Sequence, residues 1–444
     1  MLEKIKQALQ KNPEIKAWII RQETTRSSQQ YDLKDRTEAV REVESELYTI
    51  DVLCDAEDAD GKLTSGVGTV SILPNGEISS ALQKAVLTAQ LVHNQPYDFA
   101  DPSPIPEVEL ADQIYQNDPE GEIRNVLDSL KKTTSTYPHV RLTAAECFGQ
   151  ETTSRLVSSK GIDAEQVATD IYLQWVYIGG RGDDEVETFA EVSRRRIADL
   201  HIEEEAALRA QYTSDLLNAA EPPNYTGPVF VQGSTLAVML AGESLAGSLL
   251  QTLSSAQLKY SGETPWEVGK TIFRGEVKGD DFNAWANRQL PYGVLSSAFD
   301  KEGIPAQRVR LVKDNNLASF IADQRFANYL ELEPTGAFGN LEIPAGSTPE
   351  ADLQRGSYVE IAEFSWFNPS PITGDFSCEI RLGYQVIDGE RKPFKGGLLV
   401  GNLLDAVADV RWSQETGFYG NYLGPRAARF NSLKLAGLGD QEWV

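Results

Sequence analysis

The segment most similar to a catalytic motif is Gly242-Glu243-Ser244-Leu245-Ala246, which places a serine among small residues. Its spacing resembles the nucleophile elbow G-x-S-x-G of serine hydrolases, with alanine in the last position. Such a serine needs a preceding strand and a later histidine that takes its proton. Residues 235–240 have a helical pattern instead, and no histidine follows His201. An ordinary helical turn is therefore the favoured interpretation.

Two other pairs of residues have types that could do chemistry. His201 and Glu205 lie four residues apart, so both side chains could face one metal from a helix. The H-E-x-x-H pairing is missing and no third ligand is evident, which favours a solvated helix face. Asp300 and Glu302 are close enough in sequence for acid–base work, although such carboxylates more often cap a turn. These residues alone define no catalytic constellation.

The overall charge excludes several classes of partner. The 444 residues include 41 Lys and Arg against 66 Asp and Glu, a net charge of −25. Binding to nucleic acid needs a surplus of basic residues, so neither nucleic acid nor an anionic membrane is expected as a main partner. The 3 cysteines are scattered without C-x-x-C spacing, as in a reducing compartment. With no signal peptide and no apolar run long enough to span a bilayer, a cytoplasmic location is expected.

The elements that must position these residues follow from the hydrophobic periodicity. In the first half the pattern predicts strands near 16–24, 46–54, 63–72, 139–147, 153–159 and 165–178, and helices at 2–10, 76–93, 120–132 and 187–217. Gly66 and Gly68 fall within a predicted strand and lack the third glycine of a dinucleotide-binding loop. The run Arg194-Arg195-Arg196 falls on the last predicted helix, where acidic neighbours favour salt bridges.

The second half is richer in strands. The pattern predicts strands at 228–231, 309–313, 317–321, 358–364, 376–387 and 394–400, an apolar helix at 235–250 and a helix at 402–410. Proline-rich linkers at 96–106 and 221–227 divide the chain into regions. We expect an α+β fold with mostly antiparallel sheets, an N-terminal α/β domain and a strand-rich C-terminal domain. The expected regions are 1–95, 108–220 and 227–444.

Several segments, in order along residues 60–437, resemble the TldD/TldE (PmbA) family of peptide-processing metalloproteases, also known as modulators of DNA gyrase. The most specific is Ser297-Ala298-Phe299-Asp300-Lys301-Glu302-Gly303 with Gln307-Arg308 behind it, which is similar to the family segment S-x-x-F-D-D-E-G-x-x-x-Q-R. Residues 154–161, 227–231, 401–405 and 418–425 resemble further family segments. The resemblance implies a fold of the TldD/PmbA type.

The family's central helix gives the decisive comparison. In the catalytic TldD branch this helix carries H-E-x-x-x-H, whose histidines hold zinc while the glutamate activates water, and a later cysteine is the third ligand. At these positions this sequence keeps the glutamate as Glu243, but glycines Gly242 and Gly247 replace both histidines. No cysteine lies near Tyr419-Gly420. Because zinc needs about three protein ligands, we expect no metal on this chain.

This pattern resembles the TldE branch, which lacks the metal and pairs with a TldD-like subunit that carries the zinc. The resemblance implies a non-catalytic subunit of a heterodimer that matures leader peptides or degrades small unfolded proteins. Glu243, Asp300, Glu302 and Gly303 are the candidate residues of its peptide cleft, and none is assigned as catalytic. Exposed strand edges in the C-terminal half could dock an extended substrate.

Two alternatives stay open. The chain could be a stand-alone peptide-binding or scaffold protein, a homodimer without a proteolytic partner. It could also be an enzyme with a replaced mechanism that uses Glu243 with Asp300 or Glu302. A neighbouring gene for a TldD-like protein would favour the heterodimer over the scaffold, and stoichiometric metal would favour the replaced mechanism.

Overall fold

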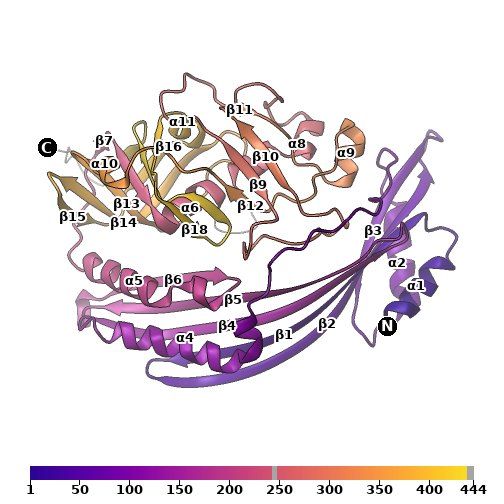
Figure 1. Ribbon diagram of the computed structural model, residues 1–444, viewed down its shortest axis with the longest axis horizontal. Coiled ribbons are helices and arrows are strands. Elements are labelled where there is room, and N and C mark those ends of the chain that lie inside the picture. Colours follow the sequence, from indigo (N-terminus) through magenta and orange to yellow (C-terminus); the bar gives the residue numbers. More distant parts are fainter. Residues whose placement is uncertain (243–247, 438–444) are drawn as a thin grey trace.

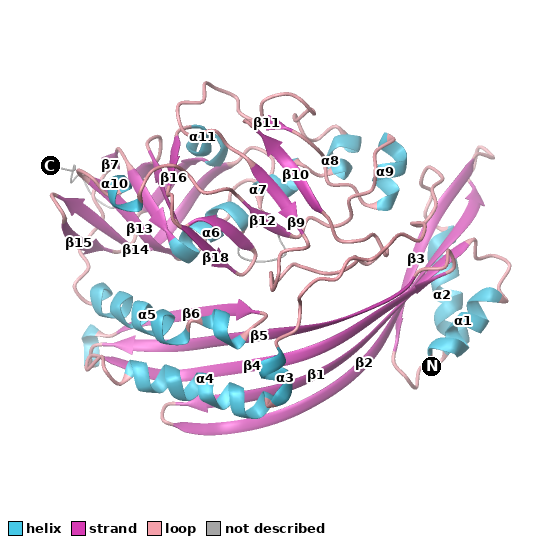
Figure 2. Ribbon diagram, viewed as in Figure 1, coloured by secondary structure: helices cyan, strands magenta, loops and turns pink. Residues whose placement is uncertain are grey.

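A computed structural model describes residues 1–242 and 248–437 and shows two layers (Figure 1). A long, curved sheet from the first half of the chain forms one layer, and the strand-rich second half lies over it (Figure 2). The expected α+β fold with mostly antiparallel sheets is confirmed. Within these residues, no helix has the length and apolar character that crossing a bilayer requires.

The first layer is a six-stranded sheet of order β3-β2-β1-β4-β5-β6 in which every pair is antiparallel. Its strands are β1 (Ala17–Leu33), β2 (Arg36–Glu57), β3 (Leu63–Ile72), β4 (Val140–Ser158), β5 (Asp163–Gly179) and β6 (Val186–Arg194). The predicted strands at 139–147 and 153–159 are one strand, β4. Because β1 pairs with β4 along most of its length, the expected regions 1–95 and 108–220 share this one sheet.

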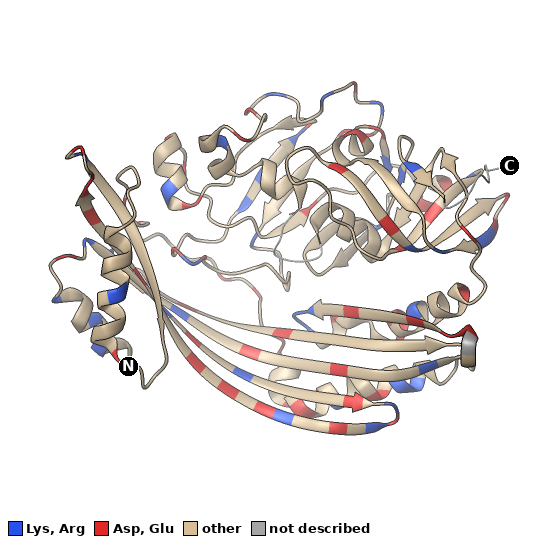
Figure 3. Cartoon of the chain, turned by 180° about the vertical axis from the view of Figure 1, so that it is seen from behind, with Lys and Arg blue, Asp and Glu red and all other residues tan. Residues whose placement is uncertain are grey.

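Helices cover one face of this sheet. They are α1 (Leu2–Gln10), α2 (Ile78–Gln90), α3 (Gln113–Asn117), α4 (Pro119–Thr134) and α5 (Ile202–Leu216). Trp18 and Ile20 pack under α1 and α2, while Cys147 and Trp175 pack under α4 and α5. Alternate residues of the same strands point to the opposite face, which carries no helix and is turned toward the viewer in Figure 3.

The predicted helix 187–217 is wrong over its first part. Residues 186–194 form the edge strand β6, two short 3₁₀ turns flank it at Gly182–Asp184 and Ile197–Leu200, and α5 begins only at Ile202. Burial alternates strictly along β6, so every second side chain packs into the core. Glu187 and Glu191 lie on the exposed face of β6. A spacing of four residues puts two side chains on the same side of a strand and also of a helix, so this spacing could not tell the two apart.

The second half contains two sheets that share a core. One has the order β11-β10-β9-β12-β19-β18, and the other has β17-β20-β8-β13-β14-β16-β21-β7 with β15 on β14. Their strands are β7 (Tyr225–Thr226), β8 (Val229–Gln232), β9 (Ala284–Asn287), β10 (Arg308–Lys313), β11 (Asn316–Leu317), β12 (Asn340–Glu342), β13 (Tyr358–Phe364), β14 (Asp375–Ile387), β15 (Glu390–Phe394), β16 (Leu398–Asn402), β17 (Val410–Trp412), β18 (Thr416–Tyr419), β19 (Tyr422–Pro425), β20 (Ala427–Phe430) and β21 (Lys434–Ala436). The central strand β8 lies between β20, antiparallel to it, and β13, parallel to it.

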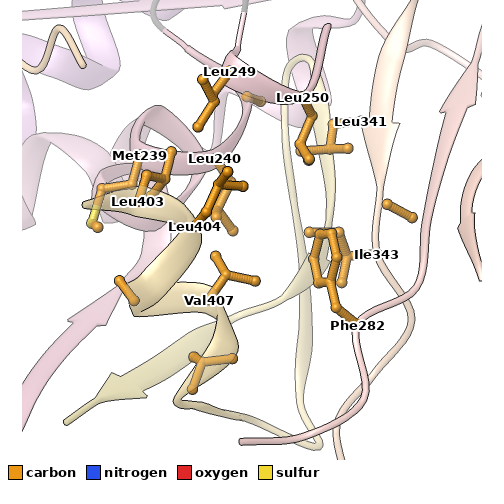
Figure 4. Packing of buried hydrophobic residues seen from close by; sticks show 14 of the residues in the cluster. Met239, Leu240, Leu249, Leu250, Phe282, Leu341, Ile343, Leu403, Leu404 and Val407 are labelled. Atoms are coloured by element: carbon orange, nitrogen blue, oxygen red, sulfur yellow. The ribbon is translucent and has the colours of Figure 1, made fainter. Parts of the chain in front are cut away.

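The helices of this half are short. They are α6 (Gly233–Ala241), α7 (Leu249–Leu253), α8 (Ala256–Ser261), α9 (Gln324–Leu330), α10 (Glu350–Leu353) and α11 (Leu403–Ala408). Helix α6 is apolar on nearly all sides, and Met239 and Leu240 pack beside Leu403 and Leu404 of α11 in the shared core (Figure 4). Of the predicted helix 235–250, the described residues of α6 and the start of α7 lie in the core, and the helix ends at Ala241, while residues 243–247 lie outside the described part of the chain.

Candidate functional site

A cleft of about 710 Å³ lies between the two halves of the chain. The first half contributes the middle of β5, strand β6 and one side of α5, and the second half contributes α6, β13 and the turn after β18. Its lining residues include Asp170, Tyr172, Phe189, Ala190, Glu191, Val192, Ser193, Arg194, Glu205, Arg209, Ser234, Thr235, Gly242, Val294, Glu363, Arg381, Tyr419, Gly420 and Asn421. The wall is mixed, with apolar, acidic and basic side chains.

The degenerate metal motif begins in the wall of this cleft. Gly242, the position of the first missing histidine, lines it and ends α6 with a φ of +81°. A side chain would be strained in that conformation, so glycine suits the end of the helix. Asn421 holds this end by donating its side-chain amide to the Ala241 carbonyl at 3.3 Å. Glu243 and Gly247 lie outside the described residues.

The donors in the described part of the chain do not fit a zinc ion. The three histidines lie elsewhere: His93 contacts the Thr64 hydroxyl at 3.1 Å, and His139 and His201 are exposed. Of the pair weighed from the sequence, only Glu205 lines the cleft. Across residues 1–242 and 248–437 no three His, Cys, Asp or Glu side chains are grouped as metal ligands would be. We therefore derive no zinc-dependent step from this chain.

Arginines pair with most of the carboxylates in the cleft. Arg209 donates to Glu363 at 3.0 Å and lies 3.8 Å from Glu205, which ties α5 to β13. Burial raises the pKa of Glu363, and the charge of Arg209 partly opposes that shift. Asp170 lies 3.6 Å from Arg195, and burial raises its pKa as well. The contact of Arg209 with Glu363 joins the two halves of the chain beside the cleft.

Two sheets end at the cleft. Strand β6 is the last strand of the N-terminal sheet, and β18 is the last strand of the sheet that begins with β11. Neither edge has a further strand paired to it in the part of the chain that the structure describes. The outer side of an edge strand offers backbone N–H and C=O groups to another extended chain. The edge formed by residues 189–194 of β6 belongs to the first half of the chain. The sequence analysis had placed the peptide-docking edges in the second half.

Asp300, Glu302 and Gly303 are not brought together with Gly242. They form a turn against the helix-free face of the N-terminal sheet, outside the lining of the cleft. Asp300 accepts hydrogen bonds from the backbone N–H of Glu302 at 2.9 Å and of Ile304 at 3.0 Å. A Cβ atom on Gly303, whose φ is +84°, would approach the Ile162 side chain to 2.7 Å. In this structure the family-like segment joins the two halves of the chain.

Glu302 gives a pH-dependent prediction. Burial raises its pKa from 4.5 to about 7. The folded state therefore favours the protonated form, and the stability this form supplies is complete below pH 4.5 and is lost as the pH rises through 7. We expect Glu302→Gln to raise the free energy of unfolding at pH 8 by about 1–3 kcal/mol. At pH 5 the variant should match the wild type.

Urea unfolding at both pH values measures this effect. Glutamine can still accept the hydrogen bond that Glu302 receives from the Gln324 N–H at 3.0 Å. Glu333→Gln, at an exposed glutamate, is the matched control and should change stability at neither pH. An equal gain for Glu302→Gln at both pH values would contradict the assignment.

The arginine run 194–196 has a role that the sequence analysis missed. Arg194 and Arg195 are buried, while Arg196 pairs with Asp199 at 2.7 Å and stacks over Tyr292. Arg195 crosses to the second half, where it donates to the carbonyls of Gly293, Val294 and Ser296. Small or apolar residues alternate with exposed ones along residues 186–194, and this alternation would have placed Arg194 on the buried face of a strand.

Comparison with known proteins agrees with this architecture. Residues 234–437 match the family model of the PmbA/TldA metallopeptidase C-terminal domain. An uncharacterised protein of Methanocaldococcus jannaschii is 24% identical over 271 residues, which cover 58% of this chain and 61% of that relative. The chain thus matches less than two thirds of the curated relative's length.

Solved structures are similar over almost the whole chain. TldE from Thermococcus kodakarensis superposes with a TM-score of 0.80 at 15% identity, covering 98% of this chain and 100% of that one. A proposed modulator of a DNA gyrase from Thermotoga maritima gives a TM-score of 0.80 at 18% identity, with the same coverage. A similar protein from Bacteroides thetaiotaomicron gives 0.79 at 15% identity, covering 98% of both chains.

Residues 234–437 therefore match the C-terminal domain of the PmbA/TldA metallopeptidases. The whole chain shares the fold of the solved TldE structure and of the two gyrase-modulator structures.

Proposed function

We propose that this chain is a non-catalytic, TldE-like subunit of a heterodimeric zinc metallopeptidase and holds unfolded peptide for a TldD-like subunit. The observation that carries the proposal is the cleft at the end of α6. The position of the family's metal motif begins there with Gly242, and the unpaired edge of strand β6 forms part of the wall. We place the zinc on the partner, because the donor set described here does not fit that ion.

Strand β6 supplies the means of holding the peptide. An extended segment can add to its free edge through backbone hydrogen bonds, which do not depend on the side chains of the peptide. A folded protein has few unpaired extended segments to offer, so such an edge selects unfolded chains of many sequences. The exposed ring of Phe189, which lines the cleft, adds apolar contact area.

The lining explains why we expect no hydrolysis by this chain alone. Peptide cleavage at neutral pH needs an activated water or a nucleophile with a base. The lining residues of the described cleft include neither histidine nor cysteine. Its carboxylates at Asp170, Glu205 and Glu363 lie beside arginines, and such pairs do not bind and activate a water molecule as a metal does.

The test is a casein or leader-peptide assay with zinc analysis on the same samples. The isolated chain should show no cleavage and well below one zinc per chain, and adding it to a TldD-like subunit should be required for chelator-sensitive cleavage. Cleavage by the isolated chain that Glu243→Ala abolishes would overturn the proposal in favour of a replaced mechanism. Cleavage by the TldD-like subunit that does not change when this chain is added would favour the homodimeric scaffold.

A variant pair tests the cleft itself. Phe189→Ala should raise KM for peptide several-fold in the assembled enzyme with little change in kcat, because the lost contact is made by the bound peptide and not by the reacting atoms. Leu91→Ala removes a side chain that is 73% exposed at the end of α2, outside the cleft, and should leave both constants unchanged. Equal effects of the two substitutions would contradict the assignment of the cleft.

A further inference from the structure

Arg194 has surroundings unlike those of the other charged groups in the cleft. It ends strand β6, lines the cleft and is only 8% exposed. Its Nη1 donates to the Ser193 carbonyl at 2.8 Å, and its buried Nε atom has no hydrogen-bond partner among the described residues. Within the described residues no carboxylate lies within 4.0 Å of its guanidinium. Arg194 is thus a buried cation without an ion-pair partner among those residues.

The neighbouring carboxylates are occupied elsewhere. Glu363 and Glu205 face Arg209, and Asp170 faces Arg195. Glu191 accepts a hydrogen bond from the Tyr172 hydroxyl at 2.7 Å. A buried charge without a partner is costly, so it is normally paired with a group of opposite sign. An anionic molecule bound in the cleft can supply this missing partner.

The backbone beside Arg194 leaves the guanidinium open to the cleft. Gly420, with a φ of +66°, follows β18, and a Cβ atom there would lie 3.3 Å from the Arg194 Nη1 atom. The Val294 N–H donates to the Gly420 carbonyl at 3.2 Å and fixes this turn. The absence of a side chain at Gly420 keeps the approach to the guanidinium clear.

We propose that Arg194 forms an anion subsite that binds a carboxylate of the peptide in the cleft. The direction of β6 makes the assignment more specific, since the strand runs from Val186 to Arg194. A peptide added in the parallel sense to its free edge ends with its carboxyl terminus at Arg194. The guanidinium fork matches the geometry of a carboxylate and strengthens its hydrogen bonds. This inference rests on one part of the proposed function, namely that the cleft binds a peptide.

The test compares three forms of a short unstructured peptide of small uncharged residues. One has a free carboxyl terminus, one is the carboxyl-terminal amide, and one is that amide with an internal glutamate. Calorimetric titration into the full chain should show that the free acid binds about tenfold tighter than the amide. Tight binding of the glutamate-containing amide would show that a side-chain carboxylate can also occupy the subsite.

Arg194→Met removes the charge and should bring the free acid and the amide to the same affinity. Arg36→Gln, at an arginine whose side chain is 74% exposed, is the control and should keep the tenfold difference. If Arg194→Met fails to fold, competition by acetate tests the subsite on the wild type. Acetate should displace the free-acid peptide but not the amide.

The outcomes separate this inference from the proposed function. Equal binding of the free acid and the amide by the wild type overturns the Arg194 subsite and leaves the peptide cleft in place. A difference that persists in Arg194→Met also overturns the subsite. Binding of none of the three peptides, alone or with the TldD-like subunit present, overturns the peptide cleft and with it the proposed function.

Discussion

Replacing Arg195 by alanine is expected to lower the free energy of unfolding by about 4 kcal/mol. The buried guanidinium donates to four backbone carbonyls, those of Thr169, Gly293, Val294 and Ser296, at 2.9–3.1 Å. Removing it takes this donor from all four carbonyls in the interface between the two halves, at about 1 kcal/mol each, although the Gly293 carbonyl still accepts from the Ser296 N–H at 2.9 Å. Asp170 also loses the cation 3.6 Å away.

Chemical denaturation of the wild type and of three variants measures this loss. Arg195→Lys keeps the charge but has fewer donors in a different geometry, so its stability should lie between those of the wild type and the alanine variant. Arg36→Ala removes an exposed arginine and should change stability by about 0.5 kcal/mol or less. A loss for Arg195→Ala no larger than that control would show that the carbonyls find other partners.

Gly68→Ala is expected to cost about 3 kcal/mol, because α2 lies directly on strand β3 at this point. A Cβ atom on Gly68 would come within 1.8 Å of the Ala85 carbonyl oxygen, and one on Gly66 within 2.0 Å of the Ala89 carbonyl oxygen. Both obstacles are backbone atoms of the helix, which cannot turn away as a flexible side chain can. The helix would have to move off the sheet and lose part of its packing.

Gly275→Ala is the matched control for this prediction. A Cβ atom added to Gly275 would have no neighbouring atom within 4 Å, and the residue has no positive φ, so alanine should be tolerated there. Thermal unfolding should show a clear fall in Tm for Gly68→Ala and almost none for Gly275→Ala. Equal melting temperatures would show that α2 can shift at little cost.

The two glycines also show how far the sequence could predict the fold. Their placement in a strand was correct, and the lack of a third glycine argued against a dinucleotide loop. Their actual role depends on the approach of α2, and a strand pattern contains no information about which helix crosses it. The hairpin around Asp314 and Asn315 was predictable, because both residues adopt a positive φ that asparagine and aspartate tolerate.

Pairing between distant strands was the part that the sequence could not supply. Strands β1 and β4 are separated by β2, β3 and three helices, yet they pair over fifteen positions from Ile19 to Leu33. Hydrophobic alternation fixes which face of each strand is buried but not which strand lies beside it. The regions inferred from the proline-rich linker at 96–106 therefore did not show that one sheet continues across it.

The candidate site was predictable only in part. The resemblance pointed to Gly242, and that residue lines the cleft. It also pointed to Asp300 and Glu302. In the structure these two residues form a turn that packs between the two halves of the chain and does not line the cleft. Arg194 was hidden by its two arginine neighbours, since a run of basic residues suggests an exposed charged surface whereas strand alternation buries this one.

The position of β8 in the middle of its sheet has a consequence for synthesis on the ribosome. Strand β8 emerges early in the second half, but its neighbours β13 and β20 follow only at Tyr358–Phe364 and Ala427–Phe430. At about 5–20 residues per second, roughly 10–40 s pass before the last neighbour is made. During that time the apolar segment Val229–Gln232 and the apolar helix α6 behind it have no sheet to enter. The nascent chain therefore exposes apolar surface that the folded protein buries.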